Sequence, residues 1–115
     1  MGEFVRGGVA MATDVAAVAA ALLGVGQVMT NVTASRFKGT TYTNTTGRTM
    51  VVFIAILASP GSGAYLYIDG AFCGEVGAST DNLRLGAVLI VPSGSTYSIN
   101  LLAGVVTIES WMELR

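Results

Sequence analysis

Short runs of apolar and β-branched residues, separated by turn residues, fill the chain from Gly26 onward. The runs predict eight strands, near residues 27–33, 40–44, 48–58, 64–68, 71–77, 84–92, 96–101 and 105–114. Their breaks recur at the spacing of about 8–12 residues that is typical of sandwiches and barrels. Between two runs, Asp69-Gly70 predicts a two-residue type I′ turn, because both residue types tolerate positive φ. The pattern therefore predicts a mainly β fold: an antiparallel, two-sheet β-sandwich, jelly-roll-like, in which consecutive hairpins close most edges.

Two of these strands indicate where the core lies. Residues 50–58 are apolar on both faces, which predicts a strand covered on both sides, with one sheet face serving as a subunit interface. The last strand is different, because strict alternation gives it one apolar and one mixed face. The apolar face carries Val106, Ile108, Met112 and Leu114, and the wet or interfacial face carries Thr107, Glu109, Trp111 and Glu113. We interpret Trp111 as an interface or core anchor, with a ligand platform as the alternative.

One stretch, residues 13–23, has a helical pattern. Thr13 can cap its start, and Gly24 follows its end. A seam with the 4-3-4 spacing of a coiled coil is formed by Met11, Val15, Val18 and Leu22. The seam has two interpretations: it packs against its own domain, or it meets equivalent helices of neighbouring subunits. Residues 1–12 are interpreted as a leader or an addition to the natural chain, and residues 25–115 as one β-domain.

Composition adds a reason to expect self-association. Apolar residue types make up 52% of the 115 residues and charged types only 11%, against about 25% charged in typical soluble domains. A small domain cannot hide so much apolar surface, since it buries only about 60–70% of what its unfolded chain exposes. The longest apolar stretches, 15–26 and 50–58, are shorter than the ~20 residues of a membrane-spanning helix. We therefore expect contact between copies and no membrane insertion.

Charge and side-chain chemistry narrow the function classes. With a formal net charge of −1 and six scattered Lys and Arg residues, the chain lacks the basic cluster that nucleic acid requires. It has no histidine, which disfavours metal binding and triad catalysis, so neither a metal nor a cofactor is expected. The single cysteine, Cys73, cannot form an internal disulfide, and we expect it to be a small buried apolar residue.

Six segments together resemble the C-terminal domain of phage tail-fibre proteins: GVGQ (24–27), VTASR (32–36), GTTYTNTTGR (39–48), YIDG (67–70), VPSGSTYSI (91–99) and IESWMELR (108–115). The resemblance covers about residues 13–115. It implies a homotrimer with an upstream fibre shaft, of which residues 13–24 are the helical end, and a β-sandwich tip that contacts the host cell. It also implies a place in the virion after synthesis in the bacterial cytoplasm, and it transfers no catalytic residue. The contacts between subunits would come from Met11, Val15, Val18, Leu22 and Trp111.

Strand polarity gives a map of the candidate receptor site. If the first strand runs away from the helix, alternate connections fall at the distal end of the domain. These are residues 34–39, 59–63, 78–83 and 102–104. They combine short polar groups, two cations and one aromatic ring, a mixture that suits a saccharide or an outer-membrane loop. The candidate residues are Arg36, Phe37, Lys38, Ser59, Ser62, Ser79, Thr80, Asp81 and Asn82, and ordinary solvated loops are the alternative interpretation.

The sequence thus favours a fibre tip that recognises a bacterial surface receptor, either saccharide or outer-membrane protein, without catalysis. The alternative is a purely structural trimerisation or fibre-end module whose receptor site lies elsewhere. A third hypothesis, a polysaccharide-degrading enzyme, needs paired acids. Glu109 and Glu113 are the one close pair on a shared face, but four strand residues separate them by about 13 Å. We therefore expect these two glutamates to be solvated.

Overall fold

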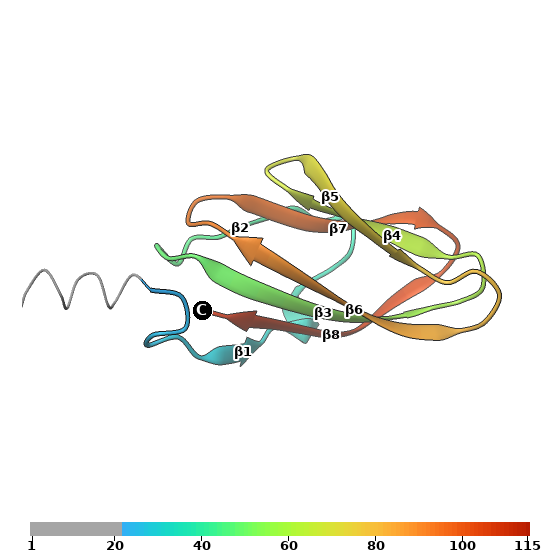
Figure 1. Ribbon diagram of the computed structural model, residues 1–115, viewed down its shortest axis with the longest axis horizontal. Coiled ribbons are helices and arrows are strands. Elements are labelled where there is room, and N and C mark those ends of the chain that lie inside the picture. Colours follow the sequence, from blue (N-terminus) through green and yellow to red (C-terminus); the bar gives the residue numbers. More distant parts are fainter. Residues whose placement is uncertain (1–21) are drawn as a thin grey trace, which may run out of the picture.

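Two sheets of four antiparallel strands pack face to face in the computed structural model, which describes residues 22–115 (Figure 1). The strands are β1 (Met29–Asn31), β2 (Tyr42–Thr43), β3 (Met50–Ala58), β4 (Gly63–Ile68), β5 (Ala71–Gly77), β6 (Leu83–Val91), β7 (Thr96–Ala103) and β8 (Val106–Leu114). One turn of 3₁₀ helix, η1 (Thr33–Ser35), follows β1. All eight predicted strands are present. The predicted helix at 13–23 lies almost entirely outside the described residues, as do Met11, Val15 and Val18.

The strands are wound as a jelly roll. The first sheet has the order β1-β8-β3-β6 and the second sheet the order β2-β7-β4-β5. The first strand therefore pairs with the eighth, the second with the seventh, the third with the sixth and the fourth with the fifth. Within residues 22–115 only β4 and β5 form a hairpin of consecutive strands. The expectation that consecutive hairpins close most edges is wrong, because the other connections cross from one sheet to the other.

The turn between β4 and β5 has the predicted geometry. Asp69 and Gly70 have φ values of +53° and +75°, and the flanking residues Ile68 and Ala71 lie opposite each other. The Asp69 carboxylate accepts hydrogen bonds from the Ser95 hydroxyl (2.8 Å) and the Thr96 backbone N–H (3.0 Å). The hairpin is therefore tied to the start of β7.

The core lies between the two sheets and takes its buried strand residues from β3, β4, β6, β7 and β8. In β3, Val52, Ile54 and Ile56 point inward and are at most 2% exposed. Tyr97 and Trp111 are the largest fully buried side chains, and their ring centroids lie 6.3 Å apart. Trp111 is thus enclosed within its own chain. It has no surface left for a contact between subunits, which corrects its assignment as a trimer contact.

A β-bulge in β8 changes which residues of that strand face the core. Ser110 lies opposite Ala55 and Ile108 opposite Ile56, so Glu109 is an extra residue in the ladder. An inserted residue reverses the alternation beyond it. Trp111 and Glu113 therefore point into the core, where both are at most 1% exposed. The prediction that they share a wet face with Glu109 is wrong for this reason.

A second bulge lies in β5, the edge strand of the second sheet. Leu66 lies opposite Gly74 and Tyr67 opposite Phe72, which leaves Cys73 as the extra residue. Cys73 is exposed, so the prediction that it is buried is wrong. Its thiol donates a hydrogen bond to the Leu66 carbonyl at 3.3 Å. The local reason is the bulge, since it takes this position out of the regular in-and-out alternation.

Candidate functional site

The two ends of the sandwich differ in what they carry. At the N-terminal end, Arg48, which precedes β3, donates a hydrogen bond to the Leu22 carbonyl, and the described chain starts here (Figure 1). At the opposite, distal end, β3 ends beside the starts of β6 and β8, and β4 starts beside the ends of β5 and β7. The connections 59–62, 78–82 and 104–105 therefore gather at the distal end. This is where strand polarity placed them.

The connection at 34–39 does not belong to these distal loops. Because β1 has only three residues, the chain leaves the first sheet early and crosses to the second sheet along the flank of the sandwich. The Gly39 N–H bonds to the carbonyl of Ile99, in the middle of β7. On this flank Phe37 is exposed, and Lys38 Nζ donates to the Val106 carbonyl. The distal placement predicted for Arg36 and Phe37 is corrected accordingly, whereas the Lys38 ammonium reaches Val106 at the start of β8.

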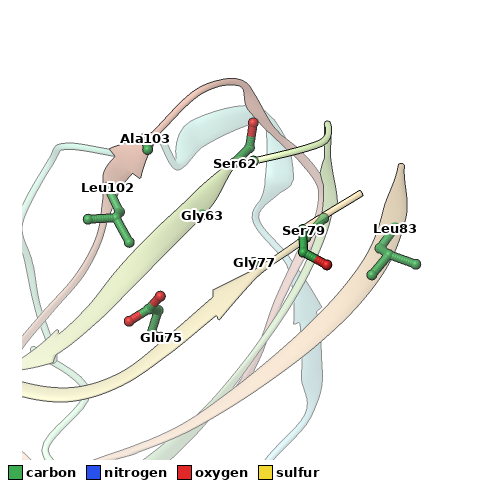
Figure 2. Close-up of a pocket in the computed structure, with 10 residues that line it drawn as sticks. Ser62, Gly63, Glu75, Gly77, Ser79, Leu83, Leu102 and Ala103 are labelled. Atoms are coloured by element: carbon green, nitrogen blue, oxygen red, sulfur yellow. The ribbon is translucent and has the colours of Figure 1, made fainter. Parts of the chain in front are cut away.

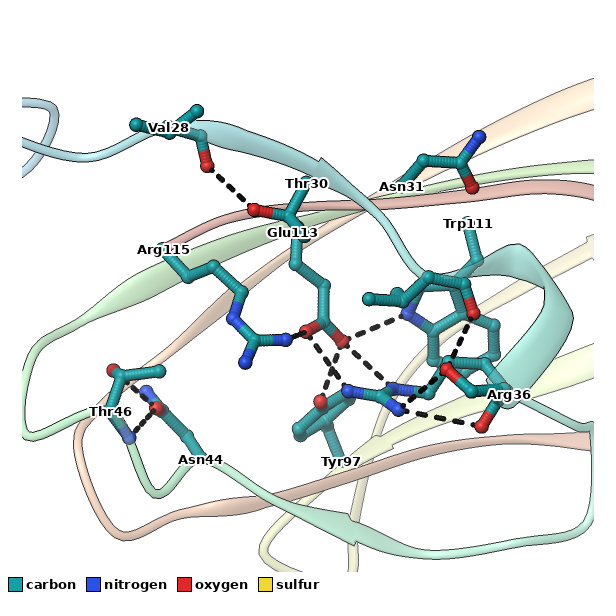
Figure 3. A network of polar contacts seen from close by, with 12 residues as sticks. Val28, Thr30, Asn31, Arg36, Asn44, Thr46, Tyr97, Trp111, Glu113 and Arg115 are labelled. Carbon is teal, nitrogen blue, oxygen red and sulfur yellow. Dashed lines mark hydrogen bonds and ion pairs between the residues drawn. The ribbon is translucent and has the colours of Figure 1, made fainter.

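Arg36 joins the two sheets through a largely buried ion pair (Figure 3). Its Nε and Nη2 donate to the two carboxylate oxygens of Glu113, each at 3.2 Å. The guanidinium also lies over the Tyr42 ring, 4.7 Å from the ring centroid. The Arg36 side chain is 17% exposed and that of Glu113 only 1%. The guanidinium of Arg36 is thus committed to the fold, and little of its surface is left for the predicted receptor contact.

Glu113 is the centre of this network. Its carboxylate accepts further hydrogen bonds from the Tyr97 hydroxyl (2.6 Å), from Trp111 Nε1 (3.1 Å) and from Arg115 Nη1 (3.1 Å). Burial alone would raise the pKa of Glu113, but the hydrogen bonds from Tyr97 and Arg36, with the charge of Arg36, lower that pKa below its ordinary value. Burial and the hydrogen bond to Glu113 raise the pKa of Tyr97 to about 12. The ionised carboxylate therefore cross-links both sheets.

The sequence held one signal for this network. Strict alternation placed Trp111, a large apolar side chain, on the same face as Glu109 and Thr107. That conflict is resolved by the bulge, which separates Trp111 and Glu113 from the wet face. No signal in the sequence could pair Glu113 with Arg36, because 77 residues separate the two partners.

At the distal end, Ser59 and Ser62 hold the loops together. Their hydroxyls lie 2.8 Å apart, and Ser62 Oγ also accepts a hydrogen bond from the Val105 N–H at 2.7 Å. The backbone N–H of Gly61 reaches the carbonyls of Ala78 and Ser79. Ser62 is buried, and its hydroxyl is hydrogen-bonded within the loops.

A hollow of about 450 Å³ opens at the distal end of the second sheet (Figure 2). Its floor includes the backbone of Gly63 and Gly77, which lie opposite each other in β4 and β5. A Cβ atom at Gly77 would come 2.8 Å from the Ser62 carbonyl oxygen, so glycine is required there. The side chains around the hollow include Glu75, Ser79, Leu83 and Leu102. This combination of one carboxylate, one hydroxyl and apolar groups suits the binding of a small polar ligand.

The other predicted distal residues lie beside this hollow. Thr80, Asp81 and Asn82 are exposed on the connection between β5 and β6, next to Ser79. The structure thus gathers these four polar residues at one end, as expected from strand polarity. Ser62 lines the hollow and Ser59 is hydrogen-bonded to it, whereas the residues at 36–38 lie on the flank.

The two glutamates considered for acid–base catalysis are separated by the fold. Glu109 is paired with Arg84 at 3.0 Å in an exposed ion pair, whereas Glu113 lies in the core. The part of the chain from residue 22 to 115 has no group of three or more His, Cys, Asp or Glu side chains that could hold a metal ion. No helix within that part is long and apolar enough to cross a membrane.

Comparison with family models, curated proteins and solved structures finds no match to this chain. The tail-fibre assignment therefore stays a prediction from the sequence motifs.

Proposed function

We propose that this protein is the homotrimeric tip of a phage or phage-like tail fibre, carried in the virion, that binds a bacterial surface receptor without catalysing a reaction. The proposal depends above all on the placement of two surfaces: a partly exposed apolar face of the first sheet lies beside the N-terminal end, and a hollow with polar and apolar lining lies at the opposite end. The first surface fits contact between copies. The second is where a fibre tip would meet a cell.

The outer face of the first sheet supports self-association. Its apolar residues form two rows of directly opposed partners: Met29, Leu114, Val51 and Ile90 in one, and Met112, Phe53 and Val88 in the next. In the single chain Val88 is 60%, Ile90 59% and Met29 46% exposed, whereas Val51 is buried at 8%. Neither row contains a charged side chain, and faces of this kind are typical of subunit interfaces.

The position of these rows also supports a fibre tip. Val51 and Ile90 lie near the start of β3 and the end of β6, at the end of the domain where the described chain starts. Copies that associate through these apolar rows would bring their N-terminal segments together and leave their distal loops at the far end. A shaft upstream of residue 22 would then continue the same assembly, and the resemblance to tail fibres favours three copies.

The oligomeric state is tested by light scattering coupled to gel filtration over a dilution series. We expect a species near three times 11.8 kDa. Val88→Lys places a charge in the proposed interface and should shift dissociation to at least tenfold higher concentration. Val105→Lys is the matched control, because Val105 is 62% exposed at the distal end. A wild-type chain that is monomeric at every concentration would remove the basis for the trimer.

Receptor recognition is tested separately with labelled protein and a panel of bacterial strains. We expect binding to some strains and competition with adsorption of the corresponding phage. An assembled trimer that binds no strain and blocks no adsorption would leave the alternative, a structural trimerisation or fibre-end module. Release of reducing sugar from bacterial polysaccharide would contradict the absence of catalysis.

A further inference from the structure

We propose that the outer face of the second sheet is a saccharide-binding site, in which an aromatic cluster and the distal hollow hold neighbouring parts of one glycan. The cluster consists of Tyr65 and Tyr67 of β4 and Phe72 of β5. This inference names the ligand class and the site within the proposed function, and it rests on host recognition as its biological setting.

The three rings form a compact cluster outside the core. Tyr65 and Phe72 have centroids 5.3 Å apart and ring planes at 87°, and Tyr67 lies 6.3 Å from each of them at 87° and 71°. Such edge-to-face contacts hold the rings in place. Phe72 nevertheless keeps 59% of its surface exposed. The cluster is therefore an ordered aromatic surface that is open to solvent.

The bulge in β5 is what brings Phe72 to this face. Glu75 lies opposite Tyr65 on the outer face, so uninterrupted alternation from Glu75 would turn Phe72 toward the core. With Cys73 as the extra residue, Phe72 instead lies opposite Tyr67 on the outer side. Bulges often occur next to binding sites, where they redirect a side chain. Here the redirected side chain completes the aromatic cluster.

Polar groups flank the rings on the same face. Tyr65 lies between Glu75 of β5 and Asn100 of β7, its direct partners across the sheet. Among residues 22–115, no side chain hydrogen-bonds to the carboxylate of Glu75, the amide of Asn100 or the hydroxyl of Tyr65 or Tyr67. A sugar ring presents C–H groups on its faces and hydroxyls around its rim. The aromatic rings can pack against the C–H groups, while the Glu75 carboxylate and the Asn100 amide bind the hydroxyls.

The hollow continues this surface toward the distal loops. Along β4 and β5, Gly63 and Gly77 are the next outward positions after Tyr65 and Glu75, about 7 Å away. The two glycines leave the strand backbones uncovered, and Glu75 borders both the cluster and the hollow. A glycan that packs on the rings can therefore place a neighbouring sugar in the hollow.

The two outer faces of the sandwich differ in the occupant that they fit. The apolar rows of the first sheet have no charged group and fit a second copy of the chain. On the second sheet, a second copy would bury Glu75 and Asn100, whose desolvation is costly unless each finds a partner. Sugar hydroxyls provide such partners in many orientations. The second sheet therefore fits a polyhydroxylated ligand.

The test uses an array printed with bacterial O-antigen, capsule and peptidoglycan oligosaccharides, followed by calorimetric titration of the glycan bound best. We expect Phe72→Ala to weaken binding at least tenfold and Glu75→Gln at least threefold. Val28→Ala is the matched control, because it truncates an apolar side chain that is 67% exposed and belongs to neither proposed surface, and the affinity of this variant should stay within twofold of the wild type. Circular dichroism checks that each variant is folded.

The outcomes separate this inference from the proposed function. Absence of glycan binding, or affinities of Phe72→Ala and Glu75→Gln within twofold of the wild type, would overturn the saccharide site. Protein that binds bacterial cells but no glycan on the array would also overturn the saccharide site, while leaving host recognition intact. Glycan binding that requires Phe72, without binding to any strain of the panel, would support the site and remove the receptor function.

Discussion

The substitution Glu113→Gln tests whether the buried carboxylate stabilises the fold as the structure implies. Two donors from Arg36 and one each from Tyr97, Trp111 and Arg115 converge on its two oxygens. Glutamine keeps the shape of the side chain but replaces one acceptor oxygen with an NH₂ group. Two or three of the five donors then lose their acceptor, and the guanidinium of Arg36 loses its counter-charge.

The expected loss of stability is large for a change of one atom. Removing one partner from a buried ion pair typically costs about 3 to 5 kcal/mol. Because glutamine retains one oxygen, we expect the lower limit, about 3 kcal/mol of the free energy of unfolding. For a domain of this size that corresponds to a fall in Tm of roughly 12 to 24 °C. The whole domain has only about 5 to 15 kcal/mol of stability to lose.

The assay is urea unfolding, followed by far-UV circular dichroism and by the fluorescence of Trp111, the single tryptophan of the chain. Protein concentration must be held constant, since association of copies adds to apparent stability. Glu109→Gln is the matched control. It makes the same substitution in the same strand, but in an exposed ion pair, where about 0 to 1 kcal/mol is expected. A Glu113→Gln protein as stable as the Glu109→Gln protein would refute the assigned role of the network.

The same network predicts a dependence on pH. The pKa of Glu113 is lowered in the folded protein, so its contribution is present above the unfolded value of 4.5 and is lost as the pH falls through the folded pKa. The Glu113→Gln protein has no titrating group at this position. Its stability should therefore fall less steeply than that of the wild type below about pH 4.5.

Two further predictions concern the loops and the thiol. Gly104→Ala should lower the free energy of unfolding by about 1 to 3 kcal/mol more than Gly47→Ala. Both glycines have positive φ, near +70° and +80°, but only at Gly104 would a Cβ collide with Ser62. Equal urea midpoints of the two variants would contradict this packing. Cys73 should react with a maleimide in the native protein, because it is exposed. The reaction at neutral pH should be slower than in the unfolded chain, because partial burial raises the pKa of the thiol. Labelling that requires unfolding would contradict the exposure of Cys73.

The positions of the strands follow from local sequence. Turn residues mark the breaks, and their effect is local because glycine, proline and aspartate act through their own φ and ψ. Asp69-Gly70 is the clearest case, since the predicted residues have the predicted positive φ. The doubly apolar run in β3 is also informative, because one of its faces lies in the core and the other, with Val51 buried and Phe53 half-buried, lies in the apolar rows of the outer face.

The faces of the strands were less predictable. Period-two alternation holds only while each residue has one partner, and the bulges at Glu109 and Cys73 break that condition. Each bulge depends on how a strand meets its neighbour in the ladder, which is not encoded within the strand alone. Alternation alone therefore predicts the wrong face for Glu113 and Trp111, and it predicts an inward Phe72 where the structure has an outward one.

Local sequence was thus sufficient for the number of strands, their turns and the polarity that gathers Ser79 to Asn82 at the distal end. Tertiary structure alone decided which strands pair, and so which charges and rings meet. Arg36 and Glu113 are 77 positions apart, and their pairing depends on the crossing between the two sheets. Contacts between strands distant in the chain arise from the packing of the whole domain, because a residue's own backbone preferences carry no information about its remote partner.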